Sequence, residues 1–380
     1  MFFYVFTYII YVLICCGFSI VTKNVNFSKY QILIFLLLLL IINSTIVSFR
    51  PIFETADTSI YYDAWKNVSI SKLKTKSKIF MLFGNREFYS MEIGFLYVMA
   101  CLKKLITFRV FLWLISFVTS CLTCYSMTLI AAYGLKIYKN KTEFSYFLRH
   151  KLIYIWTVYL VFVGVLYTSV AIRSGLSIAL CCCGVAIAVS KKNILKPIFF
   201  LILGTLIHTS GIIFIIIWIL LRFGKKSIRQ FTIYFFCFIF SVTYFLKISK
   251  FTVKSLVVLF NEIRNLFGIS GFSSYLNNVK FQFQLREGYV IFFIGLFLAL
   301  NYKNLYNISK LALVTIFGLA LATFGAPIHA ISRVTDLFMI FVIPIICSEL
   351  KGNNWKNSIS YISLPLLLYP QIILCFARID

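Results

Sequence analysis

Apolar runs long enough to cross a membrane recur along the whole chain, and they constrain its fold more than any motif does. An α-helix rises about 1.5 Å per residue, so about 20 apolar residues span the hydrocarbon core of a bilayer, and the chain divides into about 11 to 13 such runs. We place them at residues 2–21, 31–49, 91–106, 110–135, 152–170, 175–189, 194–207, 211–221, 231–246, 290–300, 311–324, 337–348 and 359–375. Because a helix satisfies its own backbone polar groups in lipid, we expect an all-α polytopic transmembrane bundle, with re-entrant or interfacial segments only beside wet cavities.

Composition excludes an ordinary soluble domain. Hydrophobic residues make up 61% of the chain and charged residues 13%, which is far from the usual balance of a globular protein. The formal net charge is +26, but the basic residues fall in short clusters between apolar runs. Such clusters are typical of cytoplasmic loops in membrane proteins, whereas a nucleic-acid surface needs a contiguous basic face. We therefore expect a multi-pass membrane protein with no nucleic-acid partner.

Two polar segments, residues 50–90 and 268–288, interrupt what we interpret as a single integral membrane domain over residues 1–380. The first segment holds seven basic residues, four acidic residues and several aromatic ones, including Tyr61. This mixture can hold a polar ligand such as a sugar by ring stacking and hydrogen bonds. The alternative is a solvated amphipathic linker, which the alternating lysines of residues 72–78 also favour.

The positive-inside rule predicts which ends of the helices share a side. Basic clusters at residues 136–151, 191–196, 222–229 and 303–310 are expected in the cytoplasm. Arg173, His208 and the second polar segment then lie on the outer face. Counting back through the expected helices puts residues 50–90 in the cytoplasm, unless one crossing before residue 135 is miscounted, and both possibilities stay open.

Arg173 lies in the segment 171–179, between two uncharged apolar runs. An arginine at the centre of a membrane helix costs roughly 2.5–3.5 kcal/mol on insertion scales, so such residues usually face a polar cavity and a partner. The alternative is a snorkelling side chain that reaches the headgroups from a helix end.

Four short segments occur in the order and spacing of a known family. They are Arg50 followed by Ala56-Asp57-Thr58-Ser59-Ile60-Tyr61, then Met91-Glu92-Ile93-Gly94-Phe95, then Ala171-Ile172-Arg173-Ser174-Gly175-Leu176-Ser177-Ile178-Ala179, and finally Leu206-Ile207-His208-Thr209-Ser210. Together they resemble the EpsG-like branch of Wzy-type polysaccharide polymerases. A weaker similarity extends to Ile331-Ser332-Arg333.

This resemblance implies a glycosyltransferase of the bacterial inner (cytoplasmic) membrane. Such an enzyme polymerises O-antigen or exopolysaccharide repeat units by moving the growing glycan from undecaprenyl pyrophosphate to the sugar of a new lipid-linked unit. It implies lipid-pyrophosphate-linked oligosaccharides and membrane lipid as partners, with a chain-length regulator as a further option. It implies no cofactor, and we find no carboxylate cluster with the ligand spacing of a metal site.

The leaving lipid pyrophosphate requires fixed positive charge where water is scarce. The planar guanidinium group suits phosphate oxygens, so Arg173 and Arg333 are candidate pyrophosphate ligands, with Arg50 as a further one or as a partner of Asp57. Arg333 is equally placed to pair with Asp336 along a helix.

The attacking sugar hydroxyl requires a proton acceptor within hydrogen-bond reach. Asp57, Glu92 and His208 are the candidates for this base or for orienting the acceptor, and Tyr61 is a candidate sugar contact. Structural alternatives exist for each candidate base: Asp57 as a helix N-cap, Glu92 as a first-turn residue favoured by the helix dipole, and His208 as a satisfied polar residue beside a turn.

Two other functions remain open. A flippase or other transporter of lipid-linked oligosaccharides also needs intramembrane arginines, but it predicts internal pseudo-symmetry, which we do not find. An O-antigen ligase uses the same donor, but we expect it to carry a larger outer loop than residues 268–288.

Overall fold

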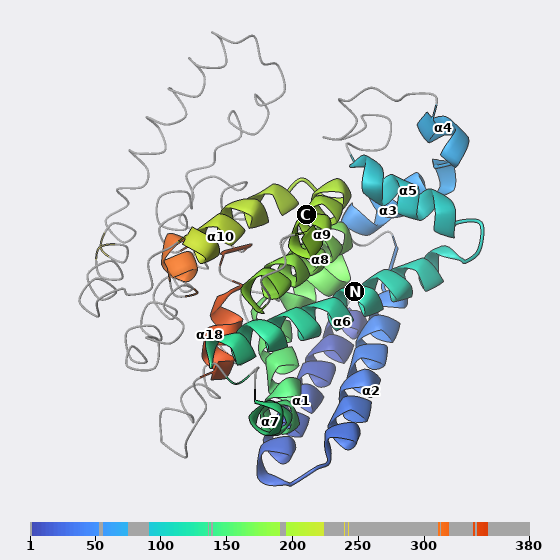
Figure 1. Ribbon diagram of the computed structural model, residues 1–380. Coiled ribbons are helices and arrows are strands. Elements are labelled where there is room, and N and C mark those ends of the chain that lie inside the picture. Colours follow the sequence, from blue (N-terminus) through green and yellow to red (C-terminus); the bar gives the residue numbers. More distant parts are fainter. Residues whose placement is uncertain are drawn as a thin grey trace. The chain divides into compact units, whose positions relative to one another are not determined.

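The computed structural model describes residues 2–52, 56–74, 91–135, 137, 140–190, 195–223, 239, 242, 311, 313–318, 337–338 and 340–348. The chain divides into two compact units, Met1–Trp218 with Ile346–Asp380, and Ile219–Ile345. Every element with described bounds is a helix, which confirms the expected all-α fold (Figure 1). The second polar segment, residues 268–288, lies outside the described residues.

The first unit contains most of the described helices. They are α1 (Phe2–Asn24), α2 (Lys29–Ser48), α3 (Ala56–Asn67), α4 (Ile70–Lys74), α5 (Ile93–Leu102), α6 (Phe108–Gly134), α7 (Lys141–Tyr159), the π-helices η3 (Leu160–Gly164) and η4 (Leu166–Val170), α8 (Ile172–Ser190) and α9 (Leu195–Ile207). Helices α10 (Gly211–Phe223) and α18 (Val342–Ser348) each include residues of both units. In the second unit, the rings of Phe317 and Phe338 pack with their centroids 5.2 Å apart.

Four helices in the described part of the chain are long and apolar enough to cross a membrane. They are Lys29–Ser48, Phe108–Gly134, Lys141–Gly164 and Ile172–Val189. Several shorter apolar helices accompany them, including α5 and α9. The chain is therefore a membrane protein. The expected run of residues 152–170 is the one whose start differs most, because α7 already begins at Lys141.

The early start of α7 has a local cause in its N-cap. Asn140 accepts hydrogen bonds from the backbone nitrogens of Thr142 and Glu143, at 3.1 Å and 3.4 Å. These bonds satisfy amide groups that the first turn of a helix leaves unpaired. Much of the basic cluster at residues 136–151 is therefore helical.

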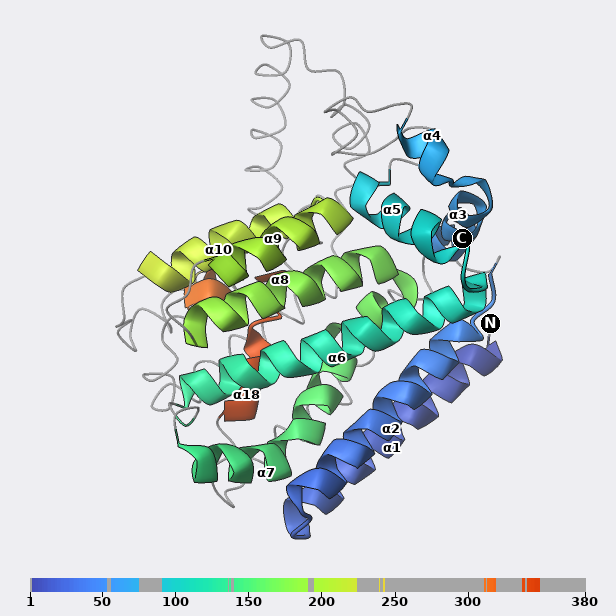
Figure 2. The same cartoon turned by 45° about the vertical axis from the view of Figure 1, so that its right-hand side comes forward.

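The long helices pack side by side, with polar side chains bonding across them. Helix α1 runs antiparallel to α2, while α6 lies between α2 and α8, and α9 covers another side of α8 (Figure 2). Asn43 of α2 accepts from the Tyr8 hydroxyl at 2.6 Å and donates to Ser116 and Ser120 of α6, each at 3.3 Å. Tyr8 also lies 3.1 Å from the hydroxyl of Thr168 in η4. Such bonds tie helices together where lipid supplies no hydrophobic driving force between them.

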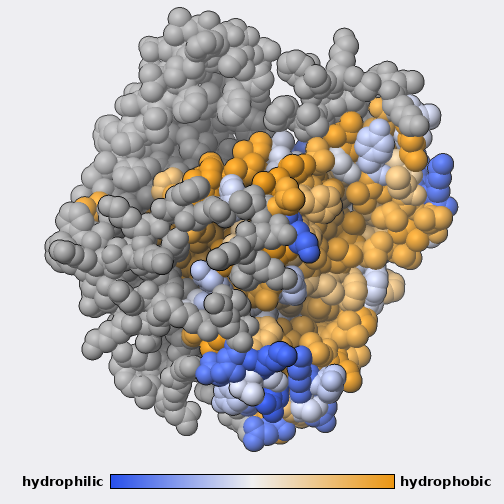
Figure 3. Space-filling model, in the orientation of Figure 1, coloured by the Kyte–Doolittle hydropathy of each residue, from blue (hydrophilic) through white to orange (hydrophobic). Residues whose placement is uncertain are grey.

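The surface of the molecule separates polar from apolar regions. Figure 3 shows hydrophilic residues gathered where α7 begins, next to a broad hydrophobic surface. At this polar end the first residues of α7, Lys141, Thr142 and Glu143, are exposed. Nearby, the His150 ring nitrogen Nδ1 lies 3.3 Å from the carbonyl oxygen of Thr22, near the end of α1. The basic cluster therefore lies at the end of the bundle where α1 finishes and α7 starts.

Helices α3 and α5 pack at the opposite end of the bundle. Tyr61 of α3 and Phe95 of α5 belong to one buried apolar cluster with Phe111, Ile172 and Ile207. Those three residues lie in the first turns of α6 and α8 and at the last residue of α9. The polar segment that starts at residue 50 is thus partly helical, and it lies on the same side as the start of α8.

This arrangement bears on the count of crossings before α6. Helix α5 has 10 residues, so it rises about 15 Å, whereas a bilayer core is about 30 Å thick. The expected crossing at residues 91–106 is therefore wrong, because its helix is too short to span. Arg50 and Arg173 lie at one end of the bundle, and the described basic residues of α7 lie toward the other.

Candidate functional site

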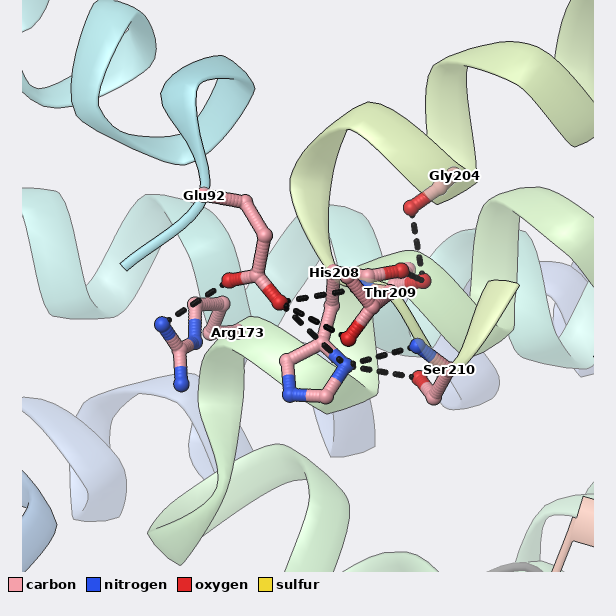
Figure 4. A network of polar contacts seen from close by, with 7 residues as sticks. Glu92, Arg173, Gly204, His208, Thr209 and Ser210 are labelled. Carbon is pink, nitrogen blue, oxygen red and sulfur yellow. Dashed lines mark hydrogen bonds and ion pairs between the residues drawn. The ribbon is translucent and has the colours of Figure 1, made fainter. Parts of the chain in front are cut away.

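Glu92 joins three separate stretches of the chain. It occupies the N-cap position of α5, with φ −70° and ψ 148°, yet its side chain makes no capping bond to its own helix. Instead, one carboxylate oxygen, Oε2, lies 2.9 Å from Nη1 of Arg173 in α8. The other oxygen, Oε1, accepts from the backbone nitrogen of Thr209 at 2.9 Å and from its hydroxyl at 3.2 Å (Figure 4). The carboxylate therefore links α5, α8 and the turn between α9 and α10.

Arg173 is the second residue of α8, where the chain leaves the π-helical segment η4. A positive side chain is unfavourable at a helix N-terminus, since the helix dipole is positive there. The Glu92 carboxylate offsets both charges, and it is buried, with 4% of its side chain exposed. The Arg173 side chain is 18% exposed, so its guanidinium does not simply reach out to the headgroups, as the snorkelling alternative required.

His208 lies in the turn Ile207–Gly211, between α9 and α10. Its ring nitrogen Nδ1 lies 2.9 Å from the Ser210 hydroxyl and accepts from the Ser210 backbone nitrogen at 3.0 Å. The His208 carbonyl oxygen accepts from the backbone nitrogen of Gly211 at 2.9 Å and from the Ser177 hydroxyl at 3.3 Å. Ser177 also donates to the Gly204 carbonyl oxygen at 2.7 Å. The end of α9 and its turn are therefore fixed to the first half of α8.

Close backbone approaches make this convergence possible. A Cβ atom at Gly175 would overlap the carbonyl oxygen of Tyr167, and one at Gly94 would overlap that of Leu206. Glycine is the residue that permits such proximity between two backbones. Gly175 lets α8 start against η4, and Gly94 lets α5 rest on the end of α9. Without these approaches, Glu92 could not reach both Arg173 and Thr209.

A second polar group surrounds Arg50, which follows α2. Arg50 is 1% exposed, and none of its three guanidinium nitrogens has a hydrogen-bond partner in the described part of the chain. Burial lowers the pKa of Arg50, while the nearby side chains of Tyr4, Tyr61 and Asp57 act in the opposite direction. Asp57 lies in the first turn of α3, half-buried, and is not its N-cap.

Tyr61 connects the two groups. Burial, followed by the nearby Asp57, raises the pKa of Tyr61 to about 12 overall, against the opposing effect of Arg173 and Arg50. Its hydroxyl also interacts with the backbone of Arg173. Tyr61 is 4% exposed and packs edge-on against Phe95, with the ring centroids 5.7 Å apart. It is thus a buried phenol that stays protonated at neutral pH between the two arginines.

Most of the candidate residues from the sequence converge at this end of the bundle. Glu92, Arg173 and His208 form one contact group, and Arg50, Asp57 and Tyr61 form a neighbouring one. Arg333 lies outside the described residues. Sequence reasoning missed the parts played by Thr209, Ser177 and Ser210, although Thr209 and Ser210 directly follow His208 in one of the four family segments. Among the described residues, no three His, Cys, Asp or Glu side chains gather in a way that could hold a metal ion.

Residues 33–379 match the model of the EpsG family, which covers nearly the whole chain. No protein of curated function matches significantly. No solved structure does so either.

Proposed function

The chain belongs to the EpsG family of exopolysaccharide-biosynthesis membrane proteins, and from this premise we propose that it is a glycosyltransferase that polymerises lipid-linked repeat units. The donor is a glycan on undecaprenyl pyrophosphate, and the acceptor is a sugar hydroxyl of the next lipid-linked unit. The observation that carries the proposal is the buried Arg50 beside Asp57, joined through Tyr61 to the group of Arg173, Glu92 and His208.

The buried guanidinium of Arg50 suits the leaving group. An arginine that is 1% exposed carries a large desolvation cost unless anions surround it. Asp57 supplies one negative charge nearby, and a pyrophosphate would supply more, in a planar bidentate geometry that guanidinium favours. Arg173 already pairs with Glu92, so we assign Arg50 the first contact with pyrophosphate and Arg173 a second. Arg333 is a further candidate ligand in this proposal.

The carboxylates suit the acceptor. Both Glu92 oxygens are engaged, one by Arg173 and one by Thr209, which fits a role in holding the site together. Asp57 is half-buried beside Arg50, and we assign it the proton of the attacking hydroxyl. Tyr61 and His208 then position the sugar.

Sidedness supports an outer-face reaction in the bacterial cytoplasmic membrane. The basic start of α7 lies at the end of the bundle opposite the site, and the positive-inside rule places such clusters in the cytoplasm. The basic residues of segment 50–90 are the exception to this rule. The site therefore faces the outer leaflet in this proposal, where lipid-linked units arrive for polymerisation.

The test is polymerisation by the purified protein in lipid vesicles supplied with a lipid-linked repeat unit, with product length read on a gel. We expect a ladder from the native chain and from Arg149→Ala, whose guanidinium Nε donates to the Ser145 carbonyl oxygen of its own helix, α7, at 3.5 Å. Arg50→Ala and Arg173→Ala should each lower the rate by about 10²–10³, the usual cost of removing one group that stabilises a developing charge.

Three results would count against polymerisation. A single transfer to a foreign acceptor without a ladder would favour a ligase. Movement of lipid-linked units between leaflets, with no new glycosidic bond, would favour a flippase. A full ladder from Arg50→Ala and Arg173→Ala would remove these residues from the site.

A further inference from the structure

We propose that His208 works as a neutral hydrogen-bond donor through Nε2, and that the backbone amide of Ser210 fixes this tautomer. His208 is therefore not the base that accepts the proton of the sugar hydroxyl. The part of the inference that concerns catalysis rests on the proposed polymerase function. The part that concerns the tautomer rests only on the turn itself.

The tautomer follows from what surrounds Nδ1. The Ser210 backbone nitrogen lies 3.0 Å from Nδ1, and an amide N–H can only donate. Nδ1 must therefore present its lone pair, and in a neutral imidazole the proton then sits on Nε2. The Ser210 hydroxyl, 2.9 Å from the same nitrogen, can donate to Nδ1 as well. Figure 4 shows both Ser210 atoms on one side of the ring, with the other ring nitrogen directed away from them.

The contact between His208 and Glu92 agrees with a neutral ring. Nδ1 lies 3.9 Å from Glu92 Oε1, which is too long for a hydrogen bond. Oε1 is occupied by two donors from Thr209. Glu92 and Arg173, the charged residues of this contact group in the described part of the chain, already neutralise each other at 2.9 Å. A proton on Nδ1 would remove the acceptor of the Ser210 amide, so the ring would have to turn away from this amide and leave it unpaired.

The turn itself is held firmly. The His208 carbonyl accepts from Gly211 and from Ser177, and the backbone nitrogen of His208 donates to the Gly204 carbonyl at 3.0 Å. These bonds keep the Ser210 amide beside the ring, so a charged ring would face this amide donor without a lone pair to accept from it. The neutral ring is therefore the form that this fold stabilises.

In the proposed reaction, the proton of the acceptor hydroxyl therefore goes to Asp57 and not to His208. The acceptor hydroxyl oxygen forms a bond to the anomeric carbon of the donor, and the bond from that carbon to pyrophosphate breaks, with the electron pair leaving on pyrophosphate. The hydroxyl proton passes to the Asp57 carboxylate. His208 keeps its Nε2 proton throughout and donates a hydrogen bond to a substrate oxygen.

The tautomer can be measured without any activity. The chain has three histidines, so His150→Gln with His329→Gln leaves His208 as the single signal in nitrogen NMR of the full-length protein, labelled with ¹⁵N-histidine, in lipid nanodiscs. We expect one pyridine-type nitrogen at Nδ1 and one protonated nitrogen at Nε2 at neutral pH. A protonated Nδ1, in either the other tautomer or the doubly protonated ring, would overturn the inference.

The polymerisation activity of His208 variants shows whether His208 acts as a hydrogen-bond donor or as a base. In His208→Gln, the side-chain amide reaches the position of Nε2 and can donate there, but it cannot accept a proton at neutral pH. His208→Asn is the matched control, since its shorter amide reaches only the position of Nδ1. We expect His208→Gln to retain polymerisation within about tenfold and His208→Asn to lose far more, whereas a base predicts a loss of about 10²–10⁴ for both.

Equal losses in both variants, or no loss in either, would overturn the donor role. If the native protein forms no ladder at all, the polymerase proposal fails, and the NMR measurement still decides the tautomer.

Discussion

The ion pair between Glu92 and Arg173 predicts a large and specific loss of stability when its charge is removed. In Glu92→Gln the amide keeps an oxygen for Thr209, but an NH₂ group then faces Nη1 of Arg173 in place of Oε2. Glu92 is 4% exposed and Arg173 is 18% exposed, so the arginine is left charged in a mostly dry site. Breaking a buried pair by removing one partner costs about 3–5 kcal/mol in the free energy of unfolding.

The melting temperature converts this cost into a measurable shift. At about 2–4 °C per kcal/mol, the loss corresponds to roughly 6–20 °C. A thiol-reactive fluorogenic dye suits the measurement in detergent, because several free cysteines become reactive only when the helices separate. The buried ones in the described residues are Cys15, Cys124, Cys181, Cys182, Cys183 and Cys347.

A double-mutant cycle measures directly how much Glu92 and Arg173 stabilise each other. In Arg173→Met the carboxylate is left without its cation, and we expect a similar loss. The double variant Glu92→Gln with Arg173→Met removes both charges, so its loss should be well below the sum of the single losses. Additive losses, with a coupling below about 0.5 kcal/mol, would refute the idea that the two side chains stabilise each other.

Two further predictions concern helix packing and use the same melting assay. Gly175→Ala should lower the free energy of unfolding by about 1–3 kcal/mol, because the new methyl group overlaps the Tyr167 carbonyl. Gly17→Ala is the matched control: no atom lies near its Cβ, and we expect it to raise the free energy of unfolding by about 0.5–1 kcal/mol. Equal effects of the two substitutions would contradict the role of the close approach at Gly175. Asn43→Leu should lower the free energy of unfolding by about 1–2 kcal/mol, since it removes the hydrogen bonds that join α1, α2 and α6. An unchanged melting temperature would show that these hydrogen bonds do not stabilise the helix packing.

Most of the described helices could be predicted from the sequence, because a bilayer demands long apolar runs, while the expected runs at residues 231–246, 290–300 and 359–375 lie almost entirely outside the described residues. The misses have physical reasons. Lys141 and Arg149 broke the apolar pattern at the start of α7, although Asn140, with Glu143 three residues later, is a typical N-cap signal. At the end of α5, Lys103 and Lys104 already marked a helix too short to cross.

The candidate site was predictable as a set of residues but not as a set of pairs. Arg173, Glu92 and His208 stood out by charge in apolar surroundings. Sequence spacing does not reveal that Glu92 pairs with Arg173. Nor does it reveal that Ser210, and not Glu92, makes the hydrogen bonds to the His208 ring. Both facts depend on where the fold places the backbone. The π-helical turns before Arg173 belong to the same class, since they arise from a shift in backbone hydrogen bonding.

The large sequence separation between Glu92 and Thr209 also determines when the site can form during synthesis. Its partner Thr209 lies 117 residues further along the chain. At synthesis rates of about 5–20 residues per second, the carboxylate waits roughly 6–23 s for the amide that will bind it. Until Arg173, its ion-pair partner 81 residues further along the chain, has also been made, the carboxylate must stay in contact with water, because an unpaired carboxylate in lipid is costly. A short α5 that remains at the surface of the membrane meets this demand, so the site is among the last parts of the first unit to close during biogenesis.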